Sequence, residues 1–194
     1  MKKVLFVNCC IRREQSRSLK LAKKFLDDLD PKEYDIEELC LMDEPLEYFK
    51  DSFFAQRERL LAEKKFDHPR FRYAWQFKDA DKIVVAAPFW DLSFPALLKV
   101  YIEQVSVDGI TFGSTDSGLQ GLCRASQLVF LTTRGGFYTG DAMEMGSRYL
   151  DALHTFFGIG AYTCTAADGM DVAGFDAAAS LAAIDRAKAL ARTF

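Results

Sequence analysis

Apolar residues fall into two alternating patterns along this chain. Short runs of mostly apolar, often β-branched residues, such as Val4-Leu5-Phe6-Val7 and Ile83-Val84-Val85, are typical of strands buried on both faces of a parallel sheet. Between these runs, apolar residues three or four positions apart are typical of amphipathic helices. We predict strands at residues 3–8, 35–41, 83–87, 127–133 and 161–167. We predict helices at residues 93–107, 143–157 and 177–192, and a further helix whose apolar residues are Leu19, Ala22, Phe25, Leu26 and Leu29.

This alternation predicts an α/β fold with a mostly parallel, doubly wound sheet. Two segments interrupt it. Residues 44–79 carry the apolar pattern of two helices, which form either a wall or lid over a site or a plain cover for the sheet. Residues 108–121 contain four glycines among Thr, Ser and Asp, which predicts an irregular or hairpin excursion.

Composition narrows the class of protein. A chain of 194 residues, 49% hydrophobic and 27% charged, is expected to form a single domain over residues 1–194. The net charge of −3, without long runs of one sign, argues against nucleic acid or a membrane surface as a partner. The apolar part of MKKVLFVNCC is too short for a signal peptide, and no run approaches the roughly 18–20 apolar residues of a membrane span. We therefore expect a cytoplasmic protein.

The five cysteines, Cys9, Cys10, Cys40, Cys123 and Cys164, are odd in number and show no C-x-x-C spacing. This pattern predicts reduced thiols rather than a disulfide framework. With only two histidines, the sequence shows no cluster of metal ligands.

The first distinctive loop follows the first strand and leads into a helix through Ser16-Arg17-Ser18. Free backbone N–H groups, the positive end of the helix dipole, two hydroxyls and a cation can converge there on a phosphate. The alternative is ordinary N-capping by Ser16 or Ser18. Residues 9–15 contain no glycine, which excludes both the G-x-G-x-x-G fingerprint and a P-loop, so a terminal phosphate fits better than a pyrophosphate.

The second loop, Pro88-Phe89-Trp90-Asp91-Leu92, follows the strand at residues 83–87. Ser93 is a candidate N-cap for the next helix, and Pro95 is tolerated in a first turn. Two large aromatic residues at the carboxyl end of a strand either face a flat ligand or cover the sheet edge.

The third loop, Thr132-Thr133-Arg134-Gly135-Gly136-Phe137-Tyr138, follows the strand at residues 127–133. Paired glycines permit close backbone approach, so their N–H groups can face an acceptor edge of a ligand. The alternatives are a simple glycine turn, with Arg134 as a surface cation and Tyr138 as a packing residue.

All three loops lie at carboxyl ends of predicted strands, which a parallel sheet places along one rim. An anion site, an aromatic wall and N–H donors together fit a phosphorylated planar ring system. Flavin mononucleotide (FMN) meets that description.

At this point the sequence resembles a family, the FMN-dependent NADH azoreductases within the flavodoxin-like NAD(P)H:quinone reductases. The likeness spans nearly the whole chain. The motifs that carry it are the Ser16-Arg17-Ser18 helix start, the proline-aromatic loop with Pro95 and Leu98-Lys99 behind it, Gly109-Ile110-Thr111-Phe112, and Arg134-Gly135-Gly136.

The resemblance implies a flavodoxin-like five-stranded sheet of order 2-1-3-4-5, noncovalent FMN, and a homodimer with the active site at the subunit interface. It implies two-electron, ping-pong reduction of quinones or azo compounds by NADH or NADPH, with no catalytic side chain because the flavin supplies the chemistry. The expected cofactor-binding residues are Cys10, Ser16, Arg17, Ser18, Pro88, Phe89, Trp90, Asp91, Leu92, Thr133, Arg134, Gly135, Gly136 and Tyr138. Arg134 and the N–H groups of Gly135 and Gly136 are expected to stabilise negative charge on the ring.

The chain departs from the family pattern at two places. Cys9-Cys10 stand where serines are usual, which puts one hydroxyl contact to the phosphate in doubt. Asp91 stands where an asparagine is usual, and a carboxylate near the ring would disfavour the anionic reduced flavin and lower its potential.

Two alternatives to the enzyme are a one-electron flavodoxin-type carrier and a non-catalytic α/β scaffold. A carrier is expected to have a strongly acidic surface on which its redox partners dock. This chain is not strongly acidic, which argues against the carrier.

Overall fold

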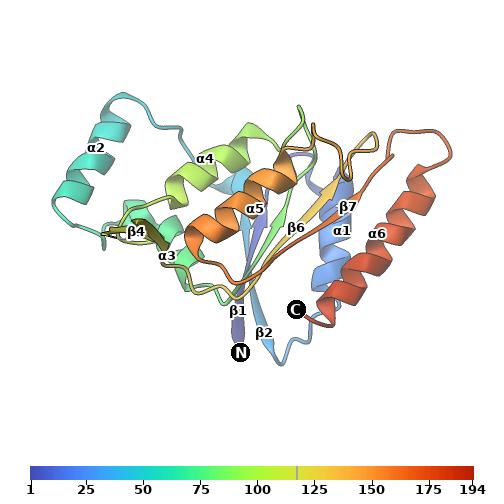
Figure 1. The fold of residues 1–194 in the computed structure, drawn as a ribbon, viewed down its shortest axis with the longest axis horizontal. Coiled ribbons are helices and arrows are strands. Elements are labelled where there is room, and N and C mark those ends of the chain that lie inside the picture. Colours follow the sequence, from blue (N-terminus) through green and yellow to red (C-terminus); the bar gives the residue numbers. More distant parts are fainter. Residues whose placement is uncertain (117) are drawn as a thin grey trace.

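The computed structural model describes residues 1–116 and 118–194. Its main sheet has the strand order β2-β1-β3-β6-β7, and every neighbouring pair is parallel (Figure 1). The strands are β1 (Lys2–Asn8), β2 (Tyr34–Cys40), β3 (Lys82–Ala86), β6 (Leu128–Thr133) and β7 (Tyr162–Ala167). This confirms the predicted α/β fold and the 2-1-3-4-5 order, since β4 and β5 lie outside this sheet.

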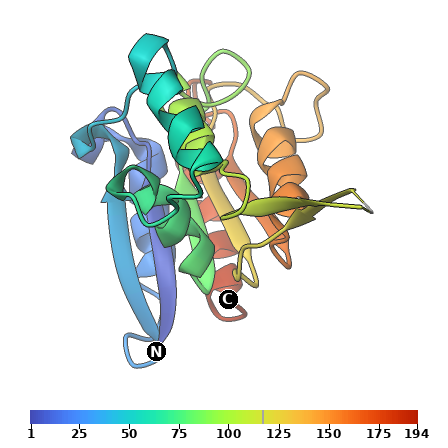
Figure 2. The ribbon, with the colours of Figure 1, turned by 90° about the vertical axis from the view of Figure 1, so that its left-hand side faces the viewer.

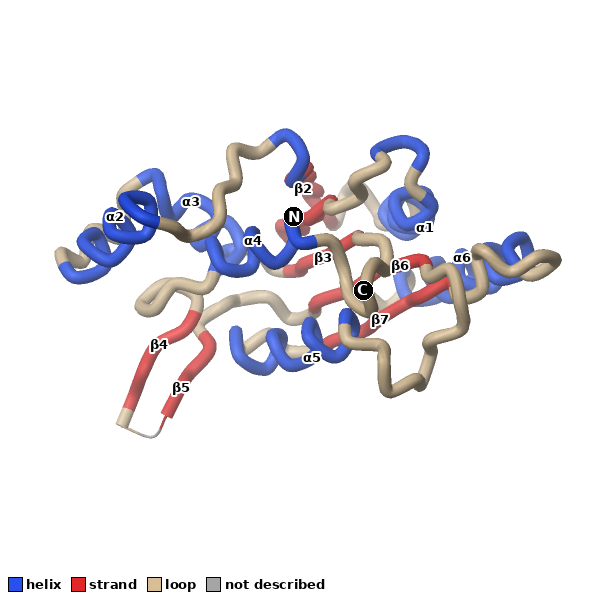
Figure 3. Tube along the Cα trace, turned by 90° about the horizontal axis from the view of Figure 1, so that it is seen from above, coloured by secondary structure: helices blue, strands red, loops and turns tan. Residues whose placement is uncertain are grey.

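Helices cover both faces of the sheet (Figures 1 and 3). One face carries α1 (Arg17–Leu26) and α6 (Asp176–Ala191), and the other carries α3 (Arg72–Asp79), α4 (Ala96–Val105) and α5 (Gly146–Phe157). Successive strand residues point to opposite faces. Leu5, Val85 and Phe130 therefore pack in the core below α3, α4 and α5, whereas Phe6 and Val84 pack in the core below α1 and α6.

The two helices predicted within residues 44–79 are α2 (Asp51–Ala62) and α3. Helix α3 covers the sheet through Tyr73 and Phe77, as the plain alternative predicted. Helix α2 forms an outer layer, where Leu60 packs with Phe71 and Val107 instead of on the sheet (Figure 2). Short 3₁₀ helices at Arg13–Gln15, Leu41–Asp43 and Pro69–Phe71 complete the helical elements.

The predicted excursion at residues 108–121 is a hairpin. Strands β4 (Phe112–Thr115) and β5 (Gly118–Gly121) pair antiparallel and project from the body (Figure 2). Ser117, within this prediction, lies outside the described residues.

Two helix starts differ from the sequence prediction. Helix α4 begins at Ala96 with Pro95 in the N-cap position, so Ser93 is not the cap. Ser93 instead exchanges two backbone hydrogen bonds with Trp90, which hold it in a turn. Helix α5 begins at Gly146 rather than at residue 143.

Among the described residues, no helix combines the length and apolar character needed to cross a membrane.

Candidate functional site

A cavity of about 360 Å³ lies at the carboxyl rim of the sheet, between the loops that follow β1, β3, β6 and β7. Eight of the predicted residues line it: Ser16, Arg17, Pro88, Phe89, Trp90, Thr133, Arg134 and Gly135. Six do not: Cys10, Ser18, Asp91, Leu92, Gly136 and Tyr138. The structure therefore brings the three predicted loops to one site and places some of their residues behind it.

Four lining residues escaped the sequence analysis: Arg12, Gln15, Met170 and Asp171. The last two follow β7, the fifth strand. Parallel strands end at one rim of the sheet, and this rule applies equally to the loop after residues 161–167. The rule therefore could have predicted Met170 and Asp171.

The start of helix α1 forms one end of the cavity. Ser16 caps the helix, because its hydroxyl accepts a hydrogen bond from the Leu19 N–H at 3.3 Å. The capping alternative is thus confirmed for Ser16, which also lines the cavity. Ser18 is fully buried, and its hydroxyl oxygen lies 2.8 Å from the Thr133 hydroxyl oxygen. Ser18 therefore ties α1 to the end of β6.

Two cations, Arg12 and Arg17, face this end of the cavity. The Arg17 guanidinium pairs with the Asp171 carboxylate at 2.7 Å, and both side chains are about half or more exposed. An exposed pair of this kind contributes little to stability, so Arg17 can turn to an incoming anion at small cost.

The aromatic loop is a tight turn. Trp90 N–H donates to the Ser93 carbonyl at 3.0 Å, and Ser93 N–H donates to the Trp90 carbonyl at 2.8 Å. The two central residues, Asp91 and Leu92, have φ values of 48° and 67°. Positive φ at both positions defines a type I′ turn, which a leucine adopts only under constraint. The turn leaves the Trp90 side chain 39% exposed at the cavity edge.

The glycine loop packs closely on the segment after β7. Gly135 C=O accepts a hydrogen bond from the Asp171 N–H at 3.0 Å, and Gly136 C=O accepts from the Gly169 N–H at 2.9 Å. A Cβ atom on Gly135 would lie 2.4 Å from an Asp171 carboxylate oxygen. A side chain at this position would therefore displace the exposed Asp171 carboxylate.

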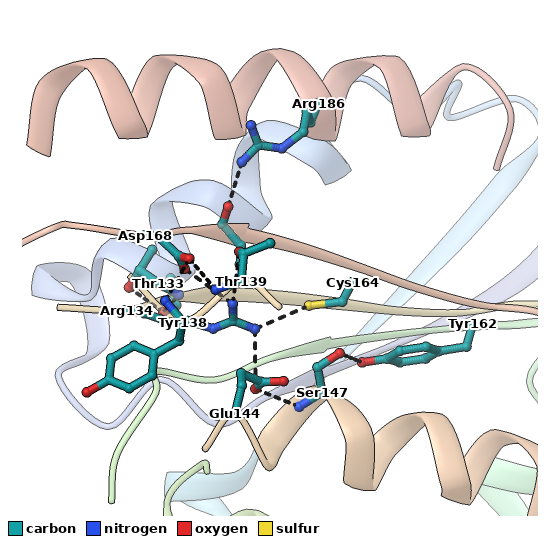
Figure 4. A network of polar contacts seen from close by, with 12 residues as sticks. Thr133, Arg134, Tyr138, Thr139, Glu144, Ser147, Tyr162, Cys164, Asp168 and Arg186 are labelled. Carbon is teal, nitrogen blue, oxygen red and sulfur yellow. Dashed lines mark hydrogen bonds and ion pairs between the residues drawn. The ribbon is translucent and has the colours of Figure 1, made fainter. Parts of the chain in front are cut away.

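Arg134 is not a surface cation. Its side chain is 3% exposed and forms ion pairs with Glu144 at 3.2 Å and with Asp168 at 3.2 Å (Figure 4). Its guanidinium carbon also lies 5.6 Å from the centre of the Phe89 ring. The guanidinium is already neutralised within the protein, so little of its charge remains free for a ligand.

The Asp168 carboxylate also accepts hydrogen bonds from two backbone N–H groups. Its second carboxylate oxygen accepts hydrogen bonds from the Tyr138 N–H at 3.0 Å and the Thr139 N–H at 2.7 Å. Partial burial raises the pKa of Asp168, but the donors from Thr139 and Tyr138 and the charge of Arg134 outweigh it, and the net pKa is lowered. Neither Glu144 nor Asp168 stands out in the sequence, because no local pattern marks a residue that pairs across 10 or 34 positions.

Tyr138 is a packing residue, which was one of the two predicted alternatives: its ring centre lies 4.6 Å from that of Phe89. Cys10 is fully buried, and its thiol donates to the Ala86 carbonyl at 3.6 Å. Burial raises the pKa of Cys10 to about 12, so the thiol stays protonated. All five cysteines are free thiols, as predicted.

The fold and this rim cavity define an α/β protein of the flavodoxin-like class. Residues 2–191 match the model of a family described by its flavodoxin-like fold, and the chain belongs to that family.

Two Clostridium relatives match this chain over its full length. An "FMN-dependent NADH:quinone oxidoreductase 2" of Clostridium acetobutylicum is 37% identical over 201 residues, covering 100% of both chains. An "FMN-dependent NADH:quinone oxidoreductase" of Clostridium perfringens is 37% identical over 198 residues, again covering 100% of both.

A solved azoreductase of Bacillus anthracis superposes with a TM-score of 0.89 at 29% identity, covering 100% of both chains. A second B. anthracis structure, an FMN-dependent NADH-azoreductase in complex with FMN, has a TM-score of 0.87 at 24% identity, covering 100% of this chain and 99% of that one. At that identity the second likeness supports the fold alone.

Proposed function

We propose that this protein is an FMN-dependent NAD(P)H oxidoreductase that reduces quinones or azo compounds. The observation that carries the proposal is the rim cavity, which joins a helix N-terminus with two arginines, an aromatic turn and a glycine loop. The names of the full-length relatives support the same class of reaction.

The donors around the cavity fit the cofactor. Ser16, Arg12 and Arg17, with the free N–H groups at the start of α1, would hold the phosphate. Phe89 and Trp90 would cover the ring, and the N–H groups of the glycine loop would meet its polar edge. When bound, FMN supplies the capacity to take two electrons from a nicotinamide and pass them to an acceptor. The predicted residues that do not line the cavity, such as Cys10 and Ser18, would support these loops from behind.

We infer a ping-pong order of substrates, because the nicotinamide and the acceptor would use this one rim cavity in turn. No side-chain nucleophile is required, so the residues of this chain bind and orient the two substrates and keep water from the ring.

A second copy of the chain would complete the site. A second cavity, of about 400 Å³, is lined by Phe94, Met145 and Tyr149 between α4 and α5. The neighbouring Leu92 is exposed, and its carbonyl accepts a hydrogen bond from the Met145 N–H. Apolar side chains gathered beside a ligand cavity are typical of an interface, and we propose a homodimer through this face.

Flavin titration followed by steady-state kinetics tests the function. Apoprotein should quench FMN fluorescence with a saturable isotherm, and replacing Ser16, which lines the cavity, by alanine should weaken binding by more than twofold, since a hydrogen bond to a charged group contributes about 1.5–3 kcal/mol. With NADH or NADPH and a quinone, double-reciprocal plots should be parallel. Intersecting lines would refute the ping-pong order, and negligible turnover of the FMN-loaded protein would favour the one-electron carrier.

Sedimentation tests the dimer separately. We expect a species of twice 21.9 kDa at micromolar concentration. A species of the monomer mass would refute the proposed interface.

A further inference from the structure

We propose that Glu144 is a positioning residue for the cofactor cavity, which it does not itself line. Through Arg134 on one side and the backbone of Met145 on the other, it would hold the aromatic turn at residues 90–93 at a fixed distance from the glycine loop. The proposal rests on the proposed function, because one of its tests uses FMN.

The first part of the link is the buried Arg134–Glu144 pair, drawn in Figure 4. The Glu144 side chain is 8% exposed, and its Oε1 atom lies 3.2 Å from Arg134 Nη2. The same oxygen accepts a hydrogen bond from the Ser147 N–H at 2.9 Å. A carboxylate at the first turn of α5 interacts favourably with the helix dipole. The carboxylate is therefore held by both the helix and the loop that carries Arg134.

The second part runs from Glu144 to the aromatic turn. The next residue, Met145, donates its backbone N–H to the Leu92 carbonyl at 2.9 Å. A Cβ atom on Gly146 would lie 3.3 Å from Glu144 Oε1 and 3.4 Å from Ser93 Cα, so the start of α5 packs directly on the turn. Because Asp91 and Leu92 both have positive φ, the turn depends on contacts from outside for its shape.

Arg134 extends the link to the glycine loop. Its own backbone leads into Gly135, which lines the cavity, and its Nη1 atom pairs with Asp168. Asp168 in turn holds the N–H groups of Tyr138 and Thr139. The buried carboxylate of Glu144 thus links the turn at residues 90–93 to the glycine loop, in addition to the direct contacts that Phe89 makes with Thr133 and Tyr138.

A variant at Glu144 should still fold. Arg134 keeps Asp168 and Thr139 as partners, so the guanidinium is not left alone in the interior. Glu144 also borders a separate polar cavity of about 530 Å³, which gives water access to the space left by a shortened side chain. An effect on FMN would then pass through the turn or through Arg134, which lines the cavity, and exchange at the Met145 amide reports on the turn.

The experiment compares Glu144→Ala, Glu144→Gln and the control Glu103→Ala, which removes an exposed carboxylate paired with Lys99 in α4. FMN dissociation constants would be measured by fluorescence at a temperature where thermal scans show every variant folded. Hydrogen exchange would follow the Met145 amide in the apoprotein. We expect Glu144→Ala to raise the dissociation constant about tenfold and to speed exchange at Met145 by a similar factor. Glu103→Ala should match the wild type.

Glu144→Gln separates positioning from charge. Its amide oxygen can still accept hydrogen bonds from the Ser147 N–H and from Arg134. Both the FMN dissociation constant and the exchange rate at Met145 should therefore lie close to the wild-type values. A contribution to global stability alone would move the thermal midpoint and leave FMN affinity of the folded protein unchanged.

The proposal is overturned if Glu144→Ala binds FMN within twofold of the wild type and leaves Met145 exchange unchanged. If that variant does not fold, Glu144→Asp decides. Aspartate keeps the negative charge, but its side chain is too short to reach both Arg134 and the Ser147 N–H. FMN binding and Met145 exchange equal to those of the wild type would refute the positioning role, and weaker FMN binding would support it. A wild-type protein that binds no FMN would instead refute the proposed function, and exchange at Met145 would then test the link alone.

Discussion

The hydroxyl oxygen of Ser18 lies 2.8 Å from that of Thr133 and accepts a hydrogen bond from the Thr133 N–H at 3.1 Å. Ser18 stands in the first turn of α1, and Thr133 is the last residue of β6. This partly buried contact fixes the start of α1 against the beginning of the glycine loop. The serine that the sequence offered as a phosphate ligand is a structural residue in this arrangement.

Replacing Ser18 by alanine should therefore lower stability more than an ordinary serine substitution. The Thr133 N–H would lose its acceptor in a partly buried place, at a cost of roughly 1–3 kcal/mol in the free energy of unfolding. Urea denaturation measures this cost. Ser52→Ala, at an exposed position of α2, is the control and should change the free energy by no more than about 0.5 kcal/mol. A loss at Ser18 no larger than at Ser52 would contradict this assignment.

Asp171→Asn should tighten FMN binding. Asp171 lines the cavity and pairs with Arg17, so its negative charge both opposes a phosphate and occupies a cation that could hold it. We expect the dissociation constant to fall about threefold at low salt and the gain to shrink as salt is added, because exposed charges are screened. Asp28→Asn, an exposed change just after the end of α1, should have no effect. Weaker binding by the Asp171 variant would show that the carboxylate contacts the ligand favourably.

Much of the fold was predictable because it depends on local patterns. Strand residues alternate between the two cores, with Leu5 and Val7 on one side of β1 and Val4 and Phe6 on the other. Parallel strands then bring their following loops to one rim, and that rule alone located most of the cavity.

The errors arose where long-range contacts decide the outcome. Ser93 has the side chain of an N-cap, but its backbone is already engaged by Trp90, so α4 starts at Ala96. Arg134 lines the cavity, where the sequence placed it, but its burial and its ion pairs with Glu144 and Asp168 were not predicted. Local propensity carries no information about such partners.

Gly121→Ala should be strongly destabilising. A Cβ atom there would lie 2.0 Å from the backbone nitrogen of Gly158 and 2.1 Å from the carbonyl carbon of Phe157, so the hairpin would have to move away from the end of α5. Backbone atoms cannot turn aside as a side chain can, and we expect a loss of about 3 kcal/mol in urea denaturation. Gly113→Ala is the matched control in the same hairpin, because its nearest neighbour would be Leu122 Cδ1 at 3.5 Å. Equal losses from the two changes would refute the close approach.

Asp168→Asn should change how stability depends on pH. The folded-state pKa of Asp168 is lowered, since hydrogen bonds from Thr139 and Tyr138 and the charge of Arg134 outweigh the opposing effect of partial burial. A lowered pKa means that ionised Asp168 stabilises the fold above its unfolded pKa of about 4, and that this contribution is lost as pH falls through the folded value. The free energy of unfolding of the wild type should therefore exceed that of the variant most clearly near neutral pH, and the difference should narrow below about pH 4. Urea denaturation at a series of pH values measures it, with the exposed Asp185→Asn as the control that shows little difference at any pH. A gap between wild type and Asp168→Asn that stays constant down to about pH 3 would mean that its ionisation is not coupled to folding.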